Sequence, residues 1–175
     1  LIKLKIKPKF ERGLRVTDEK TMEIVEMVLM GRVNKQIVRG INETGAISIG
    51  LSGLDGNLIQ ARKLKSSSHG FVGDISKINS SILDPLIEKG YIPVISSIGS
   101  SNNGISLNIN ADYVAGEIAA AINAEKLILL TDTPGILKDL NNPKSLIRNL
   151  NLKQARKYIE ENIISDGMKP KTECC

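Results

Sequence analysis

The sequence has no tryptophan, one histidine and few aromatic residues, and these shortages argue against several classes of function. Aromatic residues make up 3% of the 175 residues, so side chains on which bases could stack are scarce. The net charge is +5, but the basic residues are scattered among Asp and Glu, so we expect no nucleic-acid partner. His69 has no Cys or His partner at metal-ligand spacing, and we expect a solvated loop histidine and no metal-binding residues.

Long hydrophobic runs are also missing. The longest, residues 91–95 and 127–130, are far too short to cross a bilayer, and no signal-peptide pattern opens the chain, so we expect no membrane span. The only cysteines, Cys174 and Cys175, are adjacent and lie closer together than an ordinary disulfide prefers, so neither is expected to be structural. The chain begins without methionine inside an apparent helix end, and we interpret it as an internal fragment.

The remaining sequence alternates between helical and extended patterns, and 41% of it is hydrophobic, enough to form a core. A long amphipathic helix is expected after caps at Thr17 and Asp18, with one apolar stripe facing the core and Gly31 as a point of division. The stripe consists of Met22, Val25, Leu29, Val33, Ile37 and Ile41. Strands are expected at residues 46–51, 91–98, 105–107 and 127–130, the last fully buried, with helices at 81–89, 111–124 and 152–161. This order predicts an α/β domain with a mainly parallel, doubly wound sheet.

The most informative motif is the junction at residues 108–112, between an extended stretch and an Ala-rich helix. Asn108, Asn110 and Asp112 bring three polar side chains to a helix start, where free N–H groups and the helix dipole attract carboxylates and phosphates. Asn110 or Asp112 alone is more often a helix cap than a ligand, but the three together favour a binding site.

Three further residues are candidates because ligands of α/β sheets lie beyond the carboxyl ends of the strands. Arg15 precedes a helix start and could clamp a carboxylate, although a lone arginine is more often simply exposed. Asp132 ends the most hydrophobic strand before a Thr-Pro-Gly turn, where a phosphate or ribose site and a simple helix cap or turn are about equally plausible. Lys171, at an expected helix start, could lie over phosphates, whereas a bare lysine is usually solvated.

Together these segments resemble the amino acid kinase family, and within it the acetylglutamate kinases of cyanobacteria and plastids. The resemblance covers essentially every residue and implies a three-layer α/β/α fold, truncated at both ends. Residues 1–124 would form the acetylglutamate-binding lobe and residues 125–175 the start of the ATP-binding lobe. The matching segments are residues 13–17, 70–73, 91–97, 108–112, 129–136 and 166–171.

The resemblance implies a transferase that uses ATP, accompanied by Mg²⁺, to phosphorylate the side-chain carboxylate of N-acetyl-L-glutamate, the second step of arginine biosynthesis. Arg15 and Asn108, with Asn110 beside them, would hold the substrate, Asp112 would orient the catalytic lysines, and Lys171 would neutralise charge on the phosphoryl group. The ATP-contacting residues would be Asp132, Thr133, Pro134, Gly135, Ile136, Leu137, Ile163, Ile164 and Ser165.

Two departures from the family accompany this resemblance. The family's first catalytic lysine and its glycine-rich turn have no counterpart, so this segment alone is expected to be inactive. Lys169 also replaces an apolar residue that usually precedes the Pro-Lys pair.

The resemblance further implies a homo-oligomer, either a dimer or a hexamer, with the nitrogen-signalling PII protein as a further partner. The expected location is the cytoplasm or the plastid stroma. The main alternative is a catalytically inactive regulatory or scaffold module of the same fold. A dehydrogenase is disfavoured because no Gly-x-Gly-x-x-Gly follows an expected strand.

Overall fold

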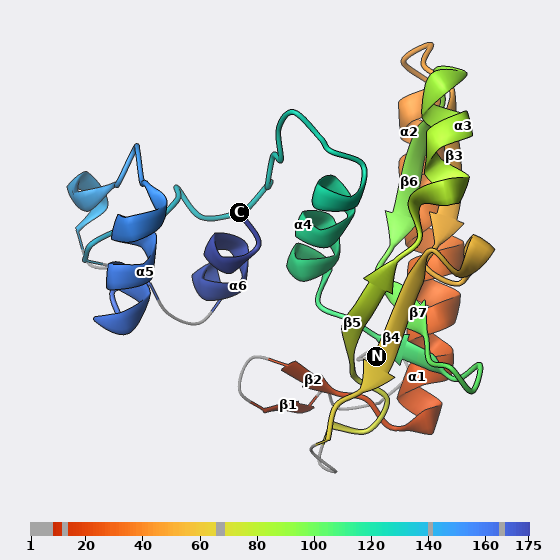
Figure 1. The fold of residues 1–175 in the computed structure, drawn as a ribbon, viewed down its shortest axis with the longest axis horizontal. Helices are drawn as coiled ribbons and strands as arrows, with labels where there is room; N and C mark the ends of the chain where they lie inside the picture. Colours follow the sequence, from red (N-terminus) through yellow and green to blue (C-terminus); the bar gives the residue numbers. More distant parts are fainter. Residues whose placement is uncertain (1–8, 12–13, 66–68, 140–141, 165–166) are drawn as a thin grey trace.

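A computed structural model describes residues 9–11, 14–65, 69–139, 142–164 and 167–175 (Figure 1). Within these ranges, no helix combines the length and the apolar character needed to cross a membrane. The expected helix end at residues 1–5 lies outside the described residues.

The long helix begins with α1 (Glu19–Glu26), continues through the π-helix η2 (Met27–Val33) and ends with α2 (Asn34–Asn42). The Asp18 carboxylate accepts a hydrogen bond from Thr21 N at 2.8 Å, so the predicted cap is confirmed. Gly31 does not divide the helix but lies inside the π segment.

The apolar stripe faces the core only in its first half. Met22 and Val25 are buried, but Val33 and Ile37 are 37% and 48% exposed, so this part of the prediction is wrong. The wider π turn shifts the residues that follow it around the helix axis relative to a 3.6-residue repeat. Asn34 is buried instead, and its amide donates to Leu51 O at 3.1 Å and Val94 O at 2.8 Å.

The strands form one parallel pair, one mixed sheet and one hairpin. β3 (Ser48–Ser52) and β6 (Ile92–Ser96) are parallel, with Leu51 opposite Ile95. The mixed sheet has the order β5-β4-β7-β8, with β4 parallel to β7 and the other neighbours antiparallel. Its strands are β4 (Ile59–Lys63), β5 (Gly73–Ile78), β7 (Ile98–Ser100) and β8 (Ser106–Asn108). The hairpin pairs β1 (Lys9–Glu11) with β2 (Leu14–Val16), and the α/β class is confirmed.

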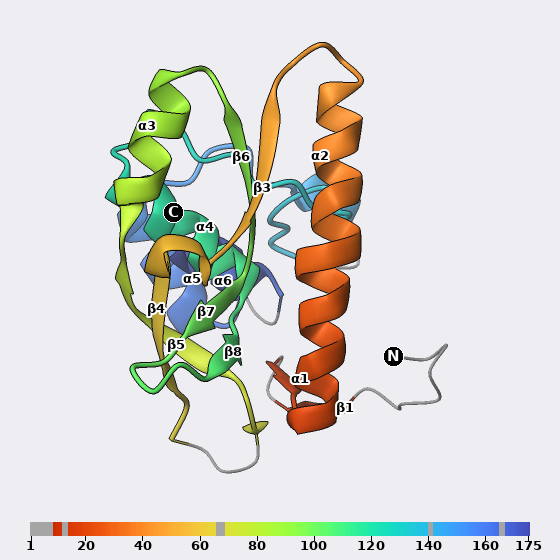
Figure 2. The same ribbon diagram turned by 90° about the vertical axis from the view of Figure 1, so that its right-hand side faces the viewer.

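Helices cover the strands from two sides. Figure 1 shows α4 (Ala111–Ala121) on one side of the strands and the long helix on the other, with α3 (Leu83–Glu88) alongside β6. Figure 2 shows the long helix running lengthwise beside β3 and β6. The main core lies between α3, α4 and the mixed sheet, where Leu58, Ile59, Leu83 and Leu107 are almost completely buried. Beyond α4 follow the short 3₁₀ helix η6 (Pro143–Ser145), α5 (Leu152–Glu160) and α6 (Met168–Glu173).

Residues 127–130, expected to be a fully buried strand, are irregular, and Ile128 and Leu130 are 76% and 91% exposed. That prediction is wrong. Among the described residues β6 pairs with β3 alone, and a groove of about 400 Å³ runs along its other side between the long helix and α4. An apolar run becomes a strand only when a neighbouring strand supplies its hydrogen bonds, and none described here lies beside this run.

His69, expected to be solvated, is buried and 6% exposed, so that prediction is also wrong. Its carbonyl accepts a hydrogen bond from Thr17 N at 3.0 Å, and Gly70 forms a bridge with Thr17. Gly70 has φ +68°, and a Cβ there would collide with the Thr17 carbonyl oxygen. The glycine therefore lets the two segments approach closely, which covers the histidine.

Candidate functional site

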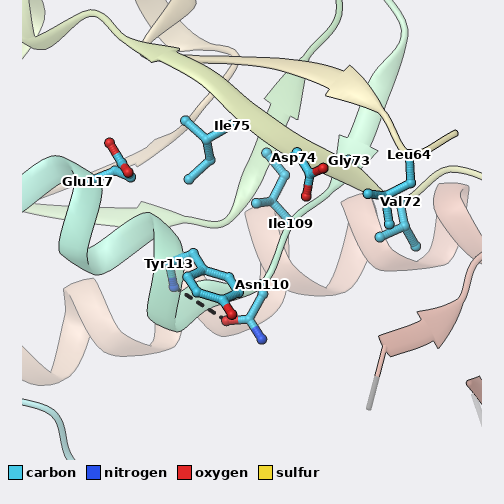
Figure 3. Close-up of a pocket in the computed structure, with 9 residues that line it drawn as sticks. All are labelled: Leu64, Val72, Gly73, Asp74, Ile75, Ile109, Asn110, Tyr113 and Glu117. Atoms are coloured by element: carbon cyan, nitrogen blue, oxygen red, sulfur yellow. Dashed lines mark hydrogen bonds between the residues drawn. The ribbon is translucent and has the colours of Figure 1, made fainter. Parts of the chain in front are cut away.

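The polar junction of residues 108–112 forms the start of α4, as predicted. Ile109 is buried and fixes the chain between β8 and the helix. Asn110 is the N-cap, and its side-chain oxygen accepts hydrogen bonds from Asp112 N at 2.9 Å and Tyr113 N at 3.4 Å (Figure 3). The structure thus shows Asn110 as a cap, which was the simpler of its two interpretations.

Asp112, in the first turn of α4, holds the ammonium group of Lys171. Lys171 Nζ lies 2.8 Å from Oδ1 and 2.8 Å from Oδ2 of the carboxylate, although 59 residues separate the two in sequence. Both side chains are about one quarter exposed, at 24% and 21%. The lysine is therefore not a bare solvated cation, and the structure brings the two predicted catalytic residues into direct contact.

Two further contacts dock α6 onto α4, and the sequence did not reveal either. Tyr113 Oη donates to Glu173 Oε2 at 2.6 Å; burial and the neighbouring Glu173 raise the pKa of the tyrosine to about 12. Gly116 faces Cys174 so closely that a Cβ on the glycine would lie 2.5 Å from the Cys174 carbonyl oxygen. The missing side chain of Gly116 therefore permits the close packing of α6 against α4.

Asn108 and the segment after Arg15 meet at a second cluster. Asn108 N donates to Phe71 O at 2.8 Å, and Phe71 N donates to Thr17 O at 2.6 Å. The Asn108 side-chain amide lies 3.4 Å from Thr17 Oγ1, a long hydrogen bond. Arg15 belongs to β2, two residues before Thr17, and the placement of its side chain lies outside what the structure describes. The backbone therefore brings the predicted substrate-binding segments together.

A pocket of about 240 Å³ lies between β5 and the first turns of α4 (Figure 3). Tyr113, Asn110 and Glu117 line it from the helix, and Asp74 and Ile75 line it from the strand. The pocket includes Asn110, the N-cap of α4, and its polar lining side chains are two carboxylates, one amide and the phenol of Tyr113.

The segment of residues 131–137 lies next to the start of α6. Thr133 Oγ1 contacts Met168 Sδ at 3.6 Å, and Thr131 Oγ1 lies 3.1 Å from Thr133 Oγ1. Gly135 has φ +129°, a conformation that favours glycine, and Leu137 bridges to Leu146. Asp132, Thr133 and Pro134 are exposed, and Gly135, Ile136 and Leu137 are partly buried. The turn therefore lies beside α6, the helix that carries Lys171.

The other predicted nucleotide contacts follow α5. Ile163 N and Ile164 N both donate to Tyr158 O, at 2.9 and 3.0 Å, and the Ile164 side chain is buried. Ile164 can therefore contact a ligand through its backbone only. Ser165 lies outside the described residues. Across the described ranges, no three His, Cys, Asp or Glu side chains gather as metal ligands.

A family model described as "Amino acid kinase family" matches residues 1–175, the whole chain. The chain belongs to the amino acid kinase family. The ion pair between α4 and α6 and the polar start of α4 thus belong to a member of this family.

Proteins named acetylglutamate kinase are similar to this chain along its entire length. One from Prochlorococcus marinus is 74% identical over 175 residues, which are 100% of this chain and 62% of the relative. Another, from Prochlorococcus marinus subsp. pastoris, is 75% identical over the same span and the same shares. The chain thus spans about three fifths of the length of these relatives.

Solved structures share the architecture. The crystal structure of smu.665 from Streptococcus mutans UA159 matches with a TM-score of 0.86 and 31% identity, covering 99% of this chain and 69% of that one. An N-acetylglutamate synthase from Neisseria gonorrhoeae, complexed with coenzyme A and N-acetyl-glutamate, matches with a TM-score of 0.79 and 22% identity, over 99% of this chain and 39% of that one. The second likeness concerns the fold alone.

Proposed function

We propose that the protein to which this chain belongs transfers the γ-phosphoryl group of ATP to the side-chain carboxylate of N-acetyl-L-glutamate. The observation that carries the proposal is the contact of Lys171 Nζ with both oxygens of Asp112 at the start of α4. Two relatives named acetylglutamate kinase, 74% and 75% identical, support the choice of substrate.

The reaction needs positioning and charge neutralisation more than proton transfer. A carboxylate is already ionised at pH 7, so no general base is required. One of its oxygens forms a bond to the γ-phosphorus while the bond from that phosphorus to the β,γ-bridging oxygen breaks, and ADP leaves with the electron pair. Lys171 would neutralise charge on the transferring group, and Asp112, which grips the ammonium through two oxygens, would keep it aimed.

Arg15 and Asn108 would hold the α-carboxylate of acetylglutamate. Support comes from the chain of backbone bonds that runs from Asn108 through Phe71 to Thr17, two residues beyond Arg15. A guanidinium and an amide both donate hydrogen bonds, as a carboxylate requires. Asn110 would act mainly through the helix, because its oxygen already caps α4.

ATP would lie along residues 132–137 and 163–165. The proximity of Thr133 to Met168 supports this, because it places the turn beside the helix of Lys171. Mg²⁺ would arrive with the nucleotide, since its preferred ligands are oxygens such as those of phosphates. The described residues offer no cluster to hold the ion, so we assign no step to it.

We further propose that the complete protein acts as a homo-oligomer in the cytoplasm, with PII as a candidate partner, and that the present segment alone is inactive. An ATP-dependent hydroxamate assay tests the last point. Turnover by the 175-residue chain near that of a complete enzyme would contradict it. A catalytically inactive scaffold would instead show no turnover in the complete protein either.

The residue roles are tested in the complete protein. Lys171→Ala should lower kcat by about a hundredfold or more, whereas Arg15→Ala should mainly raise KM for acetylglutamate. Lys169→Ala is the matched control, because Lys169 lies on the same helix and is exposed. Within the described residues its ion pair is with Glu173, at 3.8 Å. The assignment fails if Lys171→Ala and Lys169→Ala show the same kinetics.

A further inference from the structure

The two cysteines form a pair of thiols at the end of α6, the helix that carries Lys171. Cys174 Sγ lies 3.3 Å from Lys171 O, and Cys175 Sγ lies 3.1 Å from the same oxygen. Because both sulfurs contact one atom, they lie on the same side of the backbone. Cys175 is exposed and Cys174 is half-buried, so a small reagent can reach the pair.

The two thiols also contact each other. Burial, and next the neighbouring Cys175, raise the pKa of the Cys174 thiol to about 11. Cys174 therefore keeps its proton at neutral pH and can donate it to the Lys171 carbonyl. The exposed Cys175 is the better entry point for a reagent.

We propose that Cys174 and Cys175 form a dithiol site for thiophilic metal or metalloid ions, represented by trivalent arsenic, and that occupation of this site separates Lys171 from Asp112. The chemistry is condensation without a change in oxidation state. Two S–H groups and one As=O group of an organic arsenoxide give two S–As bonds, and the oxygen leaves with both protons as water. Such soft ions prefer sulfur ligands to oxygen or nitrogen ligands.

The second sulfur should increase the affinity strongly. Once Cys175 has bound, Cys174 is already beside the arsenic, so the second bond forms within one molecule at high effective concentration. A single cysteine lacks this advantage. The capture step needs only the sulfur geometry and does not depend on the proposed function.

The coupling to Lys171 follows from the packing between α6 and α4. A Cβ on Gly116 would lie 2.8 Å from Cys174 Cβ, so no room is left for a bulky group between these helices. An adduct that bridges both sulfurs also removes both S–H donors from the Lys171 carbonyl. We therefore expect α6 to move away from α4, and the ammonium of Lys171 to move away from the Asp112 carboxylate.

Titration of the 175-residue chain with phenylarsine oxide tests the site. We expect one arsenic per chain by intact mass, with release by excess 2,3-dimercaptopropanol. Cys174→Ser and Cys175→Ser should each weaken binding by about a hundredfold or more. If either variant binds as tightly as the unmodified sequence, the dithiol site is refuted.

Amine labelling tests the coupling separately. The acetylation rates of Lys171 and Lys169 are measured by peptide mass spectrometry before and after arsenic binding. Lys171, held by two carboxylate oxygens, should label several-fold faster in the adduct, while exposed Lys169 serves as the internal reference. An unchanged ratio of the two rates would overturn the coupling, and activity is not needed for either readout.

Discussion

Two regions of the described chain are stabilised by different interactions. Between residues 17 and 121, tertiary packing dominates, and Leu58, Ile59 and Leu107 are completely buried. Between residues 126 and 175, helix α5 has a capping box formed by Asn151 and Gln154 but no buried residue. Local hydrogen bonds can thus define a helix where little core exists, but they contribute about 1 kcal/mol each, far less than a buried leucine.

The site lies where these two regions meet. On α4, Asp112 contacts Lys171 of α6, and Tyr113 contacts Glu173 of α6. Gly116 of α4 faces Cys174, the residue that follows α6. One ion pair, one hydrogen bond and one close backbone approach therefore set the position of the Lys171 ammonium. A change at one of these contacts should disturb this position more readily than it disturbs the main core.

The largest expected effect contrasts two leucines from the two regions. Leu107→Ala should lower the free energy of unfolding by about 2–5 kcal/mol, because it opens a cavity in the core. Leu130→Ala, the control, should change it by less than about 0.5 kcal/mol, because that side chain is exposed. Urea unfolding measures both. Equal losses would show that residues 127–130 are packed after all.

The next contrast compares two glycines with similar backbone angles. Gly104 has φ +74° and open space around it, so Gly104→Ala should cost only the left-handed backbone strain, about 1–2 kcal/mol. Gly70→Ala should cost at least about 1 kcal/mol more, because its Cβ would collide with the Thr17 carbonyl oxygen. If the urea midpoint of Gly70→Ala were higher than that of Gly104→Ala, the close approach of Gly70 to Thr17 would be contradicted.

The smallest effect concerns pH. The folded protein raises the pKa of Tyr113 from 10.0 to about 12, so the folded state keeps this proton while the unfolded state loses it. The contribution of Tyr113 to stability is therefore fully present below pH 10 and is lost as the pH rises toward about 12. Spectrophotometric titration should show a late tyrosine ionisation that Tyr113→Phe removes. If Tyr91→Phe removes it instead, the contact with Glu173 is misassigned.

Sequence patterns predicted those elements whose cause is local. The helix start at Asp18, the strand before residue 52 and the helix after Asn110 follow from caps and apolar spacing, and the structure confirms them. The contact of Asp112 with Lys171 was expected through a family resemblance, because no local pattern relates residues 59 positions apart. Their catalytic roles stay a prediction.

The failures share one physical reason, since each depends on a distant neighbour. Residues 127–130 have the composition of a strand but no described partner, and His69 is buried because Thr17 pairs with the chain around Gly70. The π turn before Asn34 shifts the buried face of the long helix, and its position is not visible in a 3.6-residue pattern. Packing on other elements decided each case.

The sequence by itself determined the α/β class, the helix caps and the positions of the polar motifs, because propensity and periodicity act within a few residues. Only the tertiary structure decided which side chains meet: Lys171 with Asp112, Tyr113 with Glu173, and Cys174 with Gly116. These contacts depend on how α6 docks on α4. Docking is governed by shape and charge summed over both helices, and no short segment of the chain contains that information.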